Sequence, residues 1–486
     1  MSMKLLKDIL QDVNVKALIG DVNILVKKIV FNSQKCEKDT LFCAIKGDLF
    51  NGHKFIDDAI DVGANCIMCE QLPVKLKKDI TYIQVFDSRE SLGLISHNFF
   101  NHPSEKIKVI GITGTNGKTT IATLLFELFR SLQYRCGLIS TIENRINNRI
   151  ISSNSTTPDS LRIHELLNEM ILDDCQICFM EVSSHGIKQK RISGINFSFA
   201  VFTNISRDHL DYHQNLEDYI LTKKKFFDHL NSNSIAIINQ DDKYGQTMIL
   251  NCQSKAIFYS INSKTANHKA EILKNTLSGL EIKIDDNYLK TKITGFFNVY
   301  NLLAIYAIAT RLHSSKINVL NGLASLKNIL GRFNVIKIGN EINAIIDYAH
   351  SPGAIESVFQ SISTIKSDSQ NIITVVGCGG NRDVGKRPMM GNISYRNSDV
   401  TIFTSDNPRD EDILKIIDEM SIKLKKQKNK KLFKIEDRRE AIKKAVQLAR
   451  RDDIVLILGK GHEKYQEIKG KKLPFDDYKV LQNILK

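Results

Sequence analysis

The sequence predicts a mixed α/β protein of three domains, because of its length and because of the way its segments alternate. A chain of 486 residues is far longer than one hydrophobic core usually grows, so about three domains of ordinary size are expected. From about residue 106 onward, short apolar segments alternate with helix-like segments, as in parallel strands joined by crossover helices. The alternation restarts after Gly331-Arg332. We therefore expect domains at residues 1–103, 104–332 and 333–486.

The first two regions differ in their expected elements. The first mixes helix-like segments with short apolar strands at residues 40–45, 66–69 and 81–85. The second predicts a mostly parallel sheet with a helix at residues 118–132 and strands at 108–112, 177–181 and 197–203. Alternating residues from 280 to 293 predict a hairpin at the sheet's edge, with Asp286-Asn287 as its turn.

The third region repeats the pattern of the second. A helix-like segment follows each of four apolar strands, at residues 344–347, 372–376, 400–404 and 454–458. This pattern predicts a Rossmann-like C-terminal domain.

Composition indicates an ordinary globular protein of a reducing compartment. Hydrophobic residues make up 42% and charged residues 25% of the chain. No apolar run approaches the roughly 20 residues that cross a bilayer, and the first ten residues do not resemble a secretory signal. Nine cysteines, an odd number, argue against a disulfide framework. We expect a cytoplasmic protein that does not enter a membrane.

The formal charge of +14 raises the alternative of a nucleic-acid-dependent ATPase. Such a protein would carry a basic stripe interleaved with aromatic residues. Here the lysines are dispersed, and the densest run, at residues 423–434, reads as a solvated face or loop. We therefore expect anionic small-molecule substrates and no nucleic acid.

The strongest chemical signal lies between the strand at 108–112 and the helix that follows it. Glycines let backbone amides surround phosphate oxygens, a lysine reaches the outer phosphates, and the next hydroxyl suits Mg²⁺. The general pattern has glycine where this chain has Ile112, and Gly111 and Gly114 stand nearby instead. The segment predicts an ATP or GTP site formed by Gly114, Thr115, Asn116, Gly117, Lys118, Thr119 and Thr120.

Polar residues follow the next two strands at the same edge of the predicted sheet. Glu181 ends one strand, where a carboxylate can hold a hard cation near a phosphate loop. His209 follows the other strand and is a candidate for a second metal. A structural acid and a structural histidine are the alternatives. In the helix at 219–227, the pattern alone favours solvated lysines, Lys223 included.

Several motifs together resemble the Mur ligases of peptidoglycan synthesis, and the resemblance spans nearly the whole chain. The motifs, in chain order, are Gly114-Thr-Asn-Gly-Lys-Thr-Thr120, Ser155-Thr-Thr-Pro-Asp159, Glu181-Val-Ser-Ser-His-Gly186, residues 204–213, Asn298-Val-Tyr-Asn301, Gly331-Arg332, Asp347-Tyr-Ala-His350 and Gly459-Lys-Gly-His-Glu463. The resemblance implies an N-terminal domain for a uridine nucleotide, a central P-loop ATPase domain and a C-terminal Rossmann-like domain that closes over the site.

The resemblance also implies roles for residues around ATP. Lys118 and Thr119 would serve the phosphates and Mg²⁺, while Glu181 and His209 would hold metal. Lys223 falls where the family carries a lysine carbamylated by carbon dioxide, whose adduct can accept Mg²⁺. The remaining nucleotide contacts would come from Asn298, which would meet the adenine, and from Arg332 and Asp347.

The other two substrates have their own implied residues. A UDP-muramoyl dipeptide would be held by Ser33, Thr156, Thr157, Ser183, Gln189 and Arg191. Asn32 and Gln34 replace the usual Asp and Arg beside Ser33. The amino acid added would be meso-diaminopimelate, held by Arg382, Asp406, Asn407, Pro408, Arg409, Gly459 and Glu463. A guanidinium suits its additional carboxylate, which lysine lacks.

The implied activity is an ATP-dependent amide-bond ligase that proceeds through an acyl phosphate. The expected cofactors are ATP, Mg²⁺ and the carbamate on Lys223, and the expected state is a monomer. A lysine-adding ligase, an enzyme similar to folylpolyglutamate synthase and a non-catalytic nucleotide switch remain alternatives. The residues Asp406–Arg409 and Arg382 disfavour the first two, and the switch leaves Arg382 and Glu463 unexplained.

Overall fold

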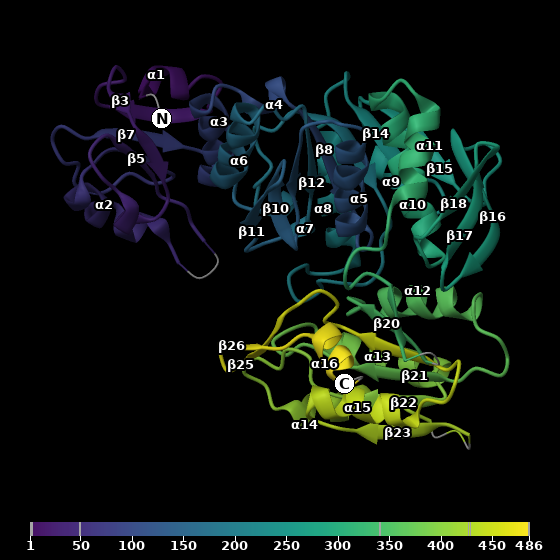
Figure 1. The fold of residues 1–486 in the computed structure, drawn as a ribbon. Coiled ribbons are helices and arrows are strands. Elements are labelled where there is room, and N and C mark those ends of the chain that lie inside the picture. The colour runs from purple at the N-terminus through teal and green to yellow at the C-terminus, as the bar shows by residue number, and fades with distance from the viewer. Residues whose placement is uncertain (1–2, 48–49, 340–341, 426, 428, 485–486) are drawn as a thin grey trace.

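The computed structural model describes residues 3–47, 50–339, 342–425, 427 and 429–484. Figure 1 shows three α/β units that follow one another along the chain, with the C-terminal unit lying below the central one. The principal sheets of the three units fall within residues 15–85, 108–291 and 334–458. The fold is therefore α/β with three domains, as predicted. The domain limits at residues 103 and 332 fall between the sheets and stay predictions.

The first unit is a five-stranded sheet with helices on both faces. Its strand order is β2-β7-β6-β5-β4, in which only β2 runs antiparallel to its neighbour. The strands are β2 Val15–Ile19, β4 Lys28–Val30, β5 Thr40–Cys43, β6 Ala64–Cys69 and β7 Thr81–Val85. The short pair β1 Lys4–Leu5 and β3 Leu25–Val26 lies beside it. Its helices are α1 Leu6–Ile9, α2 Ile56–Val62 and α3 Ser88–Phe99.

The central unit is an eleven-stranded sheet that is parallel in its middle and antiparallel at both edges. Its order is β11-β10-β9-β12-β8-β13-β14-β15-β16-β17-β18. The parallel strands are β9 Cys136–Ile139, β12 Ile177–Glu181, β8 Lys108–Thr113, β13 Phe197–Phe202, β14 Ile235–Asn239, β15 Lys255–Ser260 and β16 His268–Thr276. The edge strands are β10 Glu143–Ile146, β11 Arg149–Ser152, β17 Gly279–Ile284 and β18 Asn287–Thr291.

Helices cover both faces of this sheet. On one face lie α5 Lys118–Ser131, α10 Phe297–Leu312 and α11 Lys316–Ser325, and on the other lie α6 Ser160–Leu172 and α8 Leu216–Asp228. The helix α10 is apolar over most of its circumference because α5, α11 and the strands β14 to β16 surround it. Short helices complete the unit: α4 Pro103–Lys106, α7 Ser184–Lys188 and α9 Gly245–Ile249.

The C-terminal unit is a six-stranded sheet of order β19-β20-β24-β21-β22-β23, parallel except for β19. Its strands are β19 Asn334–Ile338, β20 Ile342–Asp347, β21 Ile372–Val376, β22 Val400–Phe403, β23 Lys431–Lys434 and β24 Ile454–Leu458. One face carries α12 Pro352–Ser363, α13 Arg387–Asn397 and α14 Ile413–Ser421, and the other carries α15 Arg438–Leu448 and α16 Asp477–Ile484. A hairpin of β25 Tyr465–Ile468 and β26 Lys471–Pro474 projects from it.

Two sequence expectations need correction or completion. The edge hairpin exists, but its turn is Asp285-Asp286 rather than Asp286-Asn287, because Asn287 pairs with Ile284. Both turn residues have positive φ, as the favoured two-residue hairpin turn requires. Residues 431–434 of the basic run form the edge strand β23, and residues 426 and 428 of that run lie outside the described residues.

The state of the cysteines and the lengths of the helices agree with the expectation of a protein without disulfides or membrane-spanning helices. All nine cysteines are free. Among the described residues, no helix combines the length and apolarity that crossing a bilayer requires.

Candidate active site

The loop between β8 and α5 has a backbone that only glycine tolerates at two positions. Gly114 and Gly117 have φ values of 145° and 90°, which side chains of L-residues rarely allow. A Cβ atom on Gly114 would lie 1.8 Å from the hydroxyl oxygen of Thr203, and one on Gly117 would lie 2.7 Å from the side-chain oxygen of Asn301. The two glycines therefore fix the path of the loop against β13 and α10.

Asn204, just after β13, holds the loop from the opposite side. Its carbonyl accepts the N–H of Thr115 at 2.8 Å, and its side-chain oxygen accepts the N–H of Asn116 at 3.0 Å. Protein groups thus occupy these two amides. The N–H groups in the first turn of α5, which contains Thr119 and Thr120, have no partner within a helix and are the natural donors to a phosphate.

Lys118 lies against its own loop. Its ammonium donates to the carbonyls of Gly114 at 2.9 Å and Thr115 at 2.8 Å. Burial lowers the pKa of Lys118, although Glu181 and Asp208 work in the opposite direction. The side chain is therefore a desolvated cation at the mouth of a phosphate loop.

Lys223 lies beneath the same loop, although its sequence pattern favoured a solvated lysine. It is 1% exposed, and its ammonium donates to the carbonyl of Gly114 at 2.9 Å. Its nitrogen also lies 4.7 Å from the ring centre of Tyr219, whose hydroxyl is 3.1 Å from that of Thr115. Burial, with a smaller effect of Lys118, lowers the pKa of Lys223 well below its usual value. The pattern-based expectation was wrong because helical periodicity shows a face but not what packs on it.

Glu181 and Thr119 form the oxygen-rich side of the site. The hydroxyl of Thr119 donates to one oxygen of Glu181 at 2.9 Å, and the N–H of Thr141 donates to the other at 2.7 Å. Glu181 is fully buried at the end of β12. A hydroxyl and a buried carboxylate are hard oxygen donors of the kind Mg²⁺ prefers, so these residues fit that ion.

His209 belongs to a charged cluster that joins two units. Asp208 lies 3.7 Å from His209, and its oxygens lie 3.9 Å from both His350 and Lys386 of the C-terminal unit. Burial alone would raise the pKa of Asp208, but His209, His350 and Lys386 hold it at about 2. Burial also lowers the pKa of His209, so its ring is neutral near pH 7 and can offer a lone pair to a metal.

Arg332 links the two units at the phosphate loop. It donates to the hydroxyl of Thr119 at 3.2 Å, and its guanidinium lies 4.5 Å from the ring centre of Tyr348. Asp347 is buried and accepts the N–H groups of Phe333 and Ala349 at 2.6 and 2.7 Å. Burial raises the pKa of Asp347, with Arg332 opposing that shift.

Gly331, just before Arg332, is packed tightly against another loop. Its φ is 74°, and a Cβ atom there would lie 2.2 Å from the backbone nitrogen of His462. The segment that connects the central and C-terminal units therefore touches the loop after β24.

A cavity of about 410 Å³ collects most of these groups. Its lining includes Thr115, Asn116, Gly117, Lys118, Thr119, Thr120, Thr156, Glu181, His209, Asn301, Arg332 and Asp347. Asn298 is not among its described lining residues, because its side chain bonds the carbonyl of Thr294 and the amide of Asn301. Contact between Asn298 and an adenine stays a prediction.

A second cavity of about 1050 Å³ lies between the first and central units. Ser33, Gln189 and Arg191 line it, as do Asn32 and Gln34. Ser155 lines this cavity, and the next residue, Thr156, lines the smaller one. Adjacent residues of this segment therefore line different cavities.

Thr157 and Ser183 build the wall beside these cavities. The hydroxyl of Thr157 donates to the carbonyl of Glu181 at 2.9 Å and accepts the N–H of Ser183 at 3.0 Å. Ser183 also caps α7 by accepting the N–H of Gly186. The carbonyl of Thr157 accepts from Arg191 at 2.6 Å, so Arg191 of the larger cavity and Glu181 of the smaller one belong to one hydrogen-bond network.

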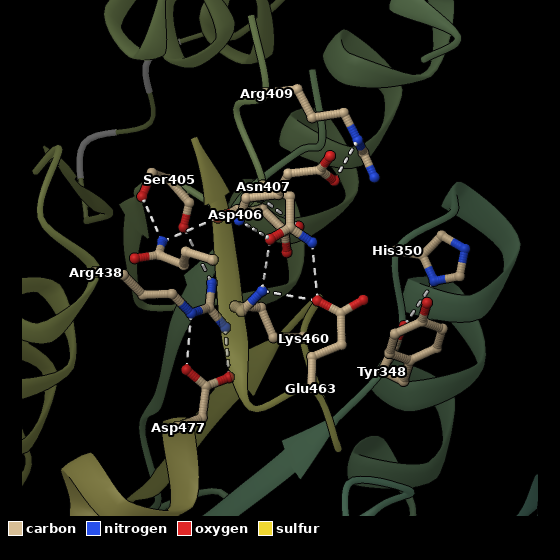
Figure 2. Close-up of polar contacts among 12 residues, drawn as sticks. Tyr348, His350, Ser405, Asp406, Asn407, Arg409, Arg438, Lys460, Glu463 and Asp477 are labelled. Carbon is tan, nitrogen blue, oxygen red and sulfur yellow. Dashed lines mark hydrogen bonds and ion pairs between the residues drawn. The ribbon is translucent and has the colours of Figure 1, made fainter. Parts of the chain in front are cut away.

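The carboxyl ends of β22 and β24 carry a cluster of hydrogen-bonded polar side chains in the C-terminal unit, which Figure 2 shows. Lys460 donates to Asn407 at 2.9 Å and to Glu463 at 2.7 Å, and Asn407 donates to Glu463 at 2.8 Å. Gly459 has a φ of 112°, and a Cβ there would lie 2.5 Å from Asp406. Pro408 and Arg409 follow in the same loop.

The side chains of Arg409 and Arg382, both predicted to bind the incoming amino acid, lie close to Gly379. Arg409 donates to Glu467 at 3.0 Å and to the carbonyl of Gly380 at 2.7 Å. A Cβ atom on Gly379 would lie 3.1 Å from Arg409 and 3.8 Å from Arg382. Arg382 is half exposed and lies 3.8 Å from Asp211 of the central unit.

A buried ion pair between Arg438 and Asp477 lies next to this polar cluster, at the end of β24. Arg438 and Asp477 are both buried and form two hydrogen bonds of 2.8 and 2.7 Å. Arg438 also donates to the carbonyl of Leu458 at 3.0 Å, which ties α15 and α16 to the end of β24.

Sequence reasoning did not single out several residues that the structure places in these sites. They are Asn204, Asp208, Asn301, Tyr348, His350, Lys386 and Lys460. Six of the seven lie inside motifs that were recognised, and Lys386 lies four residues after Arg382. The motifs thus marked the right segments of the chain but did not rank the residues within them.

Comparisons with known proteins agree with this arrangement. The chain matches the Mur ligase middle domain over residues 112–309 and the Mur ligase, glutamate ligase domain over residues 331–461. A protein of Cytophaga hutchinsonii named UDP-N-acetylmuramoyl-L-alanyl-D-glutamate--2,6-diaminopimelate ligase is 45% identical over 481 residues, 99% of each chain. A protein of the same name from Bacteroides fragilis is 43% identical over 479 residues, again 99% of each chain.

The fold agrees with a solved structure as well. It matches a structure titled UDP-N-acetylmuramoyl-L-alanyl-D-glutamate--2,6-diaminopimelate ligase with a TM-score of 0.70 and 29% identity, covering 100% of this chain and 99% of the other. Sequence, architecture and site geometry thus agree, and the chain is an enzyme of the Mur ligase family.

Proposed function

We propose that this ligase joins meso-2,6-diaminopimelate to the D-glutamyl side-chain carboxylate of UDP-N-acetylmuramoyl-L-alanyl-D-glutamate, a step of peptidoglycan synthesis, with cleavage of ATP to ADP and phosphate. The observation that carries the proposal is that adjacent residues line the two cavities, Ser155 the larger one and Thr156 the smaller one. A long nucleotide substrate held by Ser33 and Arg191 in the larger cavity would present its far end to Lys118 in the smaller one. The relatives named above, which span the whole chain, support the same reaction.

In the first step the substrate carboxylate attacks the γ-phosphorus of ATP. The bond to ADP breaks and an acyl phosphate forms. Two anions must approach each other, so nearby positive charge dominates the barrier. Lys118 and Arg332 would offset the charge that builds on the phosphate oxygens, and the N–H groups at the start of α5 would hold those oxygens in place.

In the second step the amine of diaminopimelate attacks the acyl carbon, loses a proton and expels phosphate. Arg409 would exchange Glu467 for a substrate carboxylate through paired hydrogen bonds, and Arg382 is near enough to assist. Glu463 would meet the distal ammonium, while Asp406, Asn407, Pro408 and Gly459 would complete the binding site.

Metal binding and carbamylation belong to the same proposal. Thr119 and Glu181 would hold one Mg²⁺, and His209 with a carbamylated Lys223 would hold another, which supplies charge neutralisation to the phosphates. Carbon dioxide adds to a neutral amine, forming a nitrogen–carbon bond and releasing a proton. The lowered pKa of Lys223 supports this modification, because burial favours the uncharged amine over the ammonium.

The test is amino acid dependence of phosphate release in the presence of ATP, Mg²⁺ and the UDP-muramoyl dipeptide. We expect release with meso-diaminopimelate and little with L-lysine or L-glutamate, together with a tripeptide product of the matching mass. Equal turnover with lysine would transfer the proposal to a lysine-adding ligase. Stimulation by DNA or RNA without the dipeptide would contradict it.

We also propose that the enzyme works as a monomer in the cytoplasm on these small molecules. Light scattering of the purified chain at micromolar concentration tests the first point. A mass of twice 55.1 kDa would contradict it.

A further inference from the structure

Three side chains that commonly ligate metals lie together where α3 ends and α4 begins. One ligand atom from each of His97, His102 and Glu105 lies within 4.8 Å of the other two. The Nε2 atom of His97 is 3.5 Å from the carboxylate of Glu105, and the Nδ1 atom of His102 is 3.8 Å from it. Among the described lining residues of the two cavities, none of the three appears.

Local backbone hydrogen bonds between the end of α3 and the start of α4 bring these residues together. His102 has a φ of 56°, and its N–H donates to the carbonyl of His97 at 2.8 Å, so the chain turns back at the end of α3. The N–H of Glu105 then donates to the carbonyl of His102 at 3.1 Å as α4 begins. A left-handed conformation is uncommon for a residue other than glycine, and here it places the two imidazoles on the same side.

The surroundings combine a buried ligand with an open approach. His97 is 7% exposed, and its Nδ1 atom has no hydrogen-bond partner among the described residues. The side chains of His102 and Glu105 are 41% and 56% exposed, which leaves a path from solvent. Asn196, from the segment before β13, donates to Glu105 at 3.4 Å and helps to orient it.

The geometry points to a divalent transition-metal site, and we propose that His97, His102 and Glu105 bind Zn²⁺. Two imidazole nitrogens and one carboxylate oxygen suit zinc, and a water would complete a four-coordinate ion. Zinc–ligand bonds of about 2.0–2.2 Å at tetrahedral angles separate ligand atoms by about 3.3–3.6 Å. The separations of the two histidines from Glu105 are 3.5 and 3.8 Å, close to that range, and all three ligand atoms lie within 4.8 Å of one another.

A bound ion would stiffen the connection between the first and central units. The helix α3 carries Arg89 and Leu92, which line the large cavity, so its C-terminal anchor also sets the position of that wall. This role is independent of the ligase chemistry proposed above.

The test is a zinc titration of the full-length, metal-free chain at pH 7.5, followed by calorimetry. Saturating Mg²⁺ and a non-hydrolysable ATP analogue occupy the phosphate-loop cavity during the titration. We expect one Zn²⁺ per chain, and at least tenfold weaker binding in His102→Asn and in Glu105→Gln. His229→Asn, which changes an exposed histidine elsewhere, should bind zinc like the natural chain.

Spectroscopy and thermal unfolding give independent readouts. Co²⁺ in place of Zn²⁺ should give visible absorption bands that both site variants lose. Zinc should raise the unfolding midpoint of the natural chain and of His229→Asn, but not of the site variants. Because both changed side chains are partly exposed, circular dichroism should show folded variants. Unchanged zinc affinity in both variants, or no zinc bound by the natural chain, would overturn the proposal.

Discussion

The phosphate loop and the polar cluster around Lys460 in the C-terminal unit both contain buried cations. They differ in whether those cations are paired with carboxylates. Within the part of the chain that the structure describes, Lys118 and Lys223 form no ion pair and donate instead to backbone carbonyls. In the polar cluster, Lys460 pairs with Glu463 and Arg409 pairs with Glu467. If the proposed function holds, the cations of the first region could accept an anion or a covalent modification directly, whereas those of the second would first have to exchange an internal carboxylate for a ligand.

The difference has an energetic meaning. Removing a charge from water costs several kcal/mol, and a carboxylate partner offsets part of that cost. Where no partner is present, the cost appears as a lowered pKa, as it does for both lysines. The five predictions below test whether this distinction between unpaired and paired cations holds.

The largest effect is expected for Lys118→Ala. Loss of the cation that offsets the transferred phosphoryl charge should lower kcat/KM by about 10³-fold or more, which corresponds to about 4 kcal/mol. Steady-state kinetics of the ligation measure it, with Lys225→Ala on the exposed side of α8 as the matched control. If kcat/KM of the variant stays within tenfold of that of the natural enzyme, Lys118 is not a catalytic residue.

The paired cation Arg438 should matter for stability. In Asp477→Asn the buried guanidinium loses its charged partner, which should lower the free energy of unfolding by about 3–5 kcal/mol. Urea unfolding followed by circular dichroism measures it. Lys434→Met, which breaks an exposed pair with Asp418, should cost under about 1 kcal/mol. Equal costs would show that burial is not the deciding factor.

For Lys223 the expected loss is about 10²-fold in kcat, since Lys223→Ala can neither be carbamylated nor accept Mg²⁺. Removing bicarbonate and dissolved carbon dioxide should lower the activity of the natural enzyme and leave the residual activity of the variant unchanged. Lys224→Ala, one residue away and paired with Asp228, is the control. No bicarbonate response in the natural enzyme would argue against the carbamate.

The lowered pKa of Asp208 predicts that the free energy of unfolding depends on pH. Its folded pKa of about 2 lies below the usual value of 3.8 for an aspartate, so its ionised form stabilises the folded state. That contribution, about 2 kcal/mol, should be complete above pH 4 and disappear as the pH falls through 2. Comparing urea unfolding of the natural chain and Asp208→Asn from pH 6 to pH 2 measures it. A difference between the two that stays constant with pH would contradict this assignment.

The smallest effect is expected for Arg409→Lys. An ammonium keeps the charge but loses the paired geometry, so kcat/KM for diaminopimelate should fall about tenfold while KM for ATP stays unchanged. Lys415→Arg, on the exposed side of α14, is the control. A parallel change in KM for ATP would place Arg409 in the phosphate site instead.

Much of the fold was predictable because strands at sheet centres are short apolar runs. The strands at Ile177–Glu181, Ile372–Val376 and Ile454–Leu458 were predicted with their exact limits. The edge strands β10 and β11 were not, since partly exposed antiparallel strands carry a weaker apolar signal.

Site residues could be predicted where the residue type follows from the local backbone. They could not be predicted where their surroundings depend on contacts with distant parts of the chain. Gly114 and Gly117 belong to the first group, because a side chain at either position would not fit. The burial of Lys223 depends on Tyr219 and the distant Gly114, and no local pattern contains that information. The link from Asp208 to Lys386 joins residues 178 positions apart, which is beyond reach of periodicity or spacing.

The close packing of Gly331 on the loop after β24 has a mechanical consequence. Because the connecting segment touches the backbone of Gly461 and His462, the C-terminal unit cannot swing about residue 331 without shifting that loop. The same loop carries Lys460 and Glu463. Rotation of the C-terminal unit would therefore displace Lys460 and Glu463 in the same movement, so that the interdomain angle and the position of these two side chains are mechanically coupled.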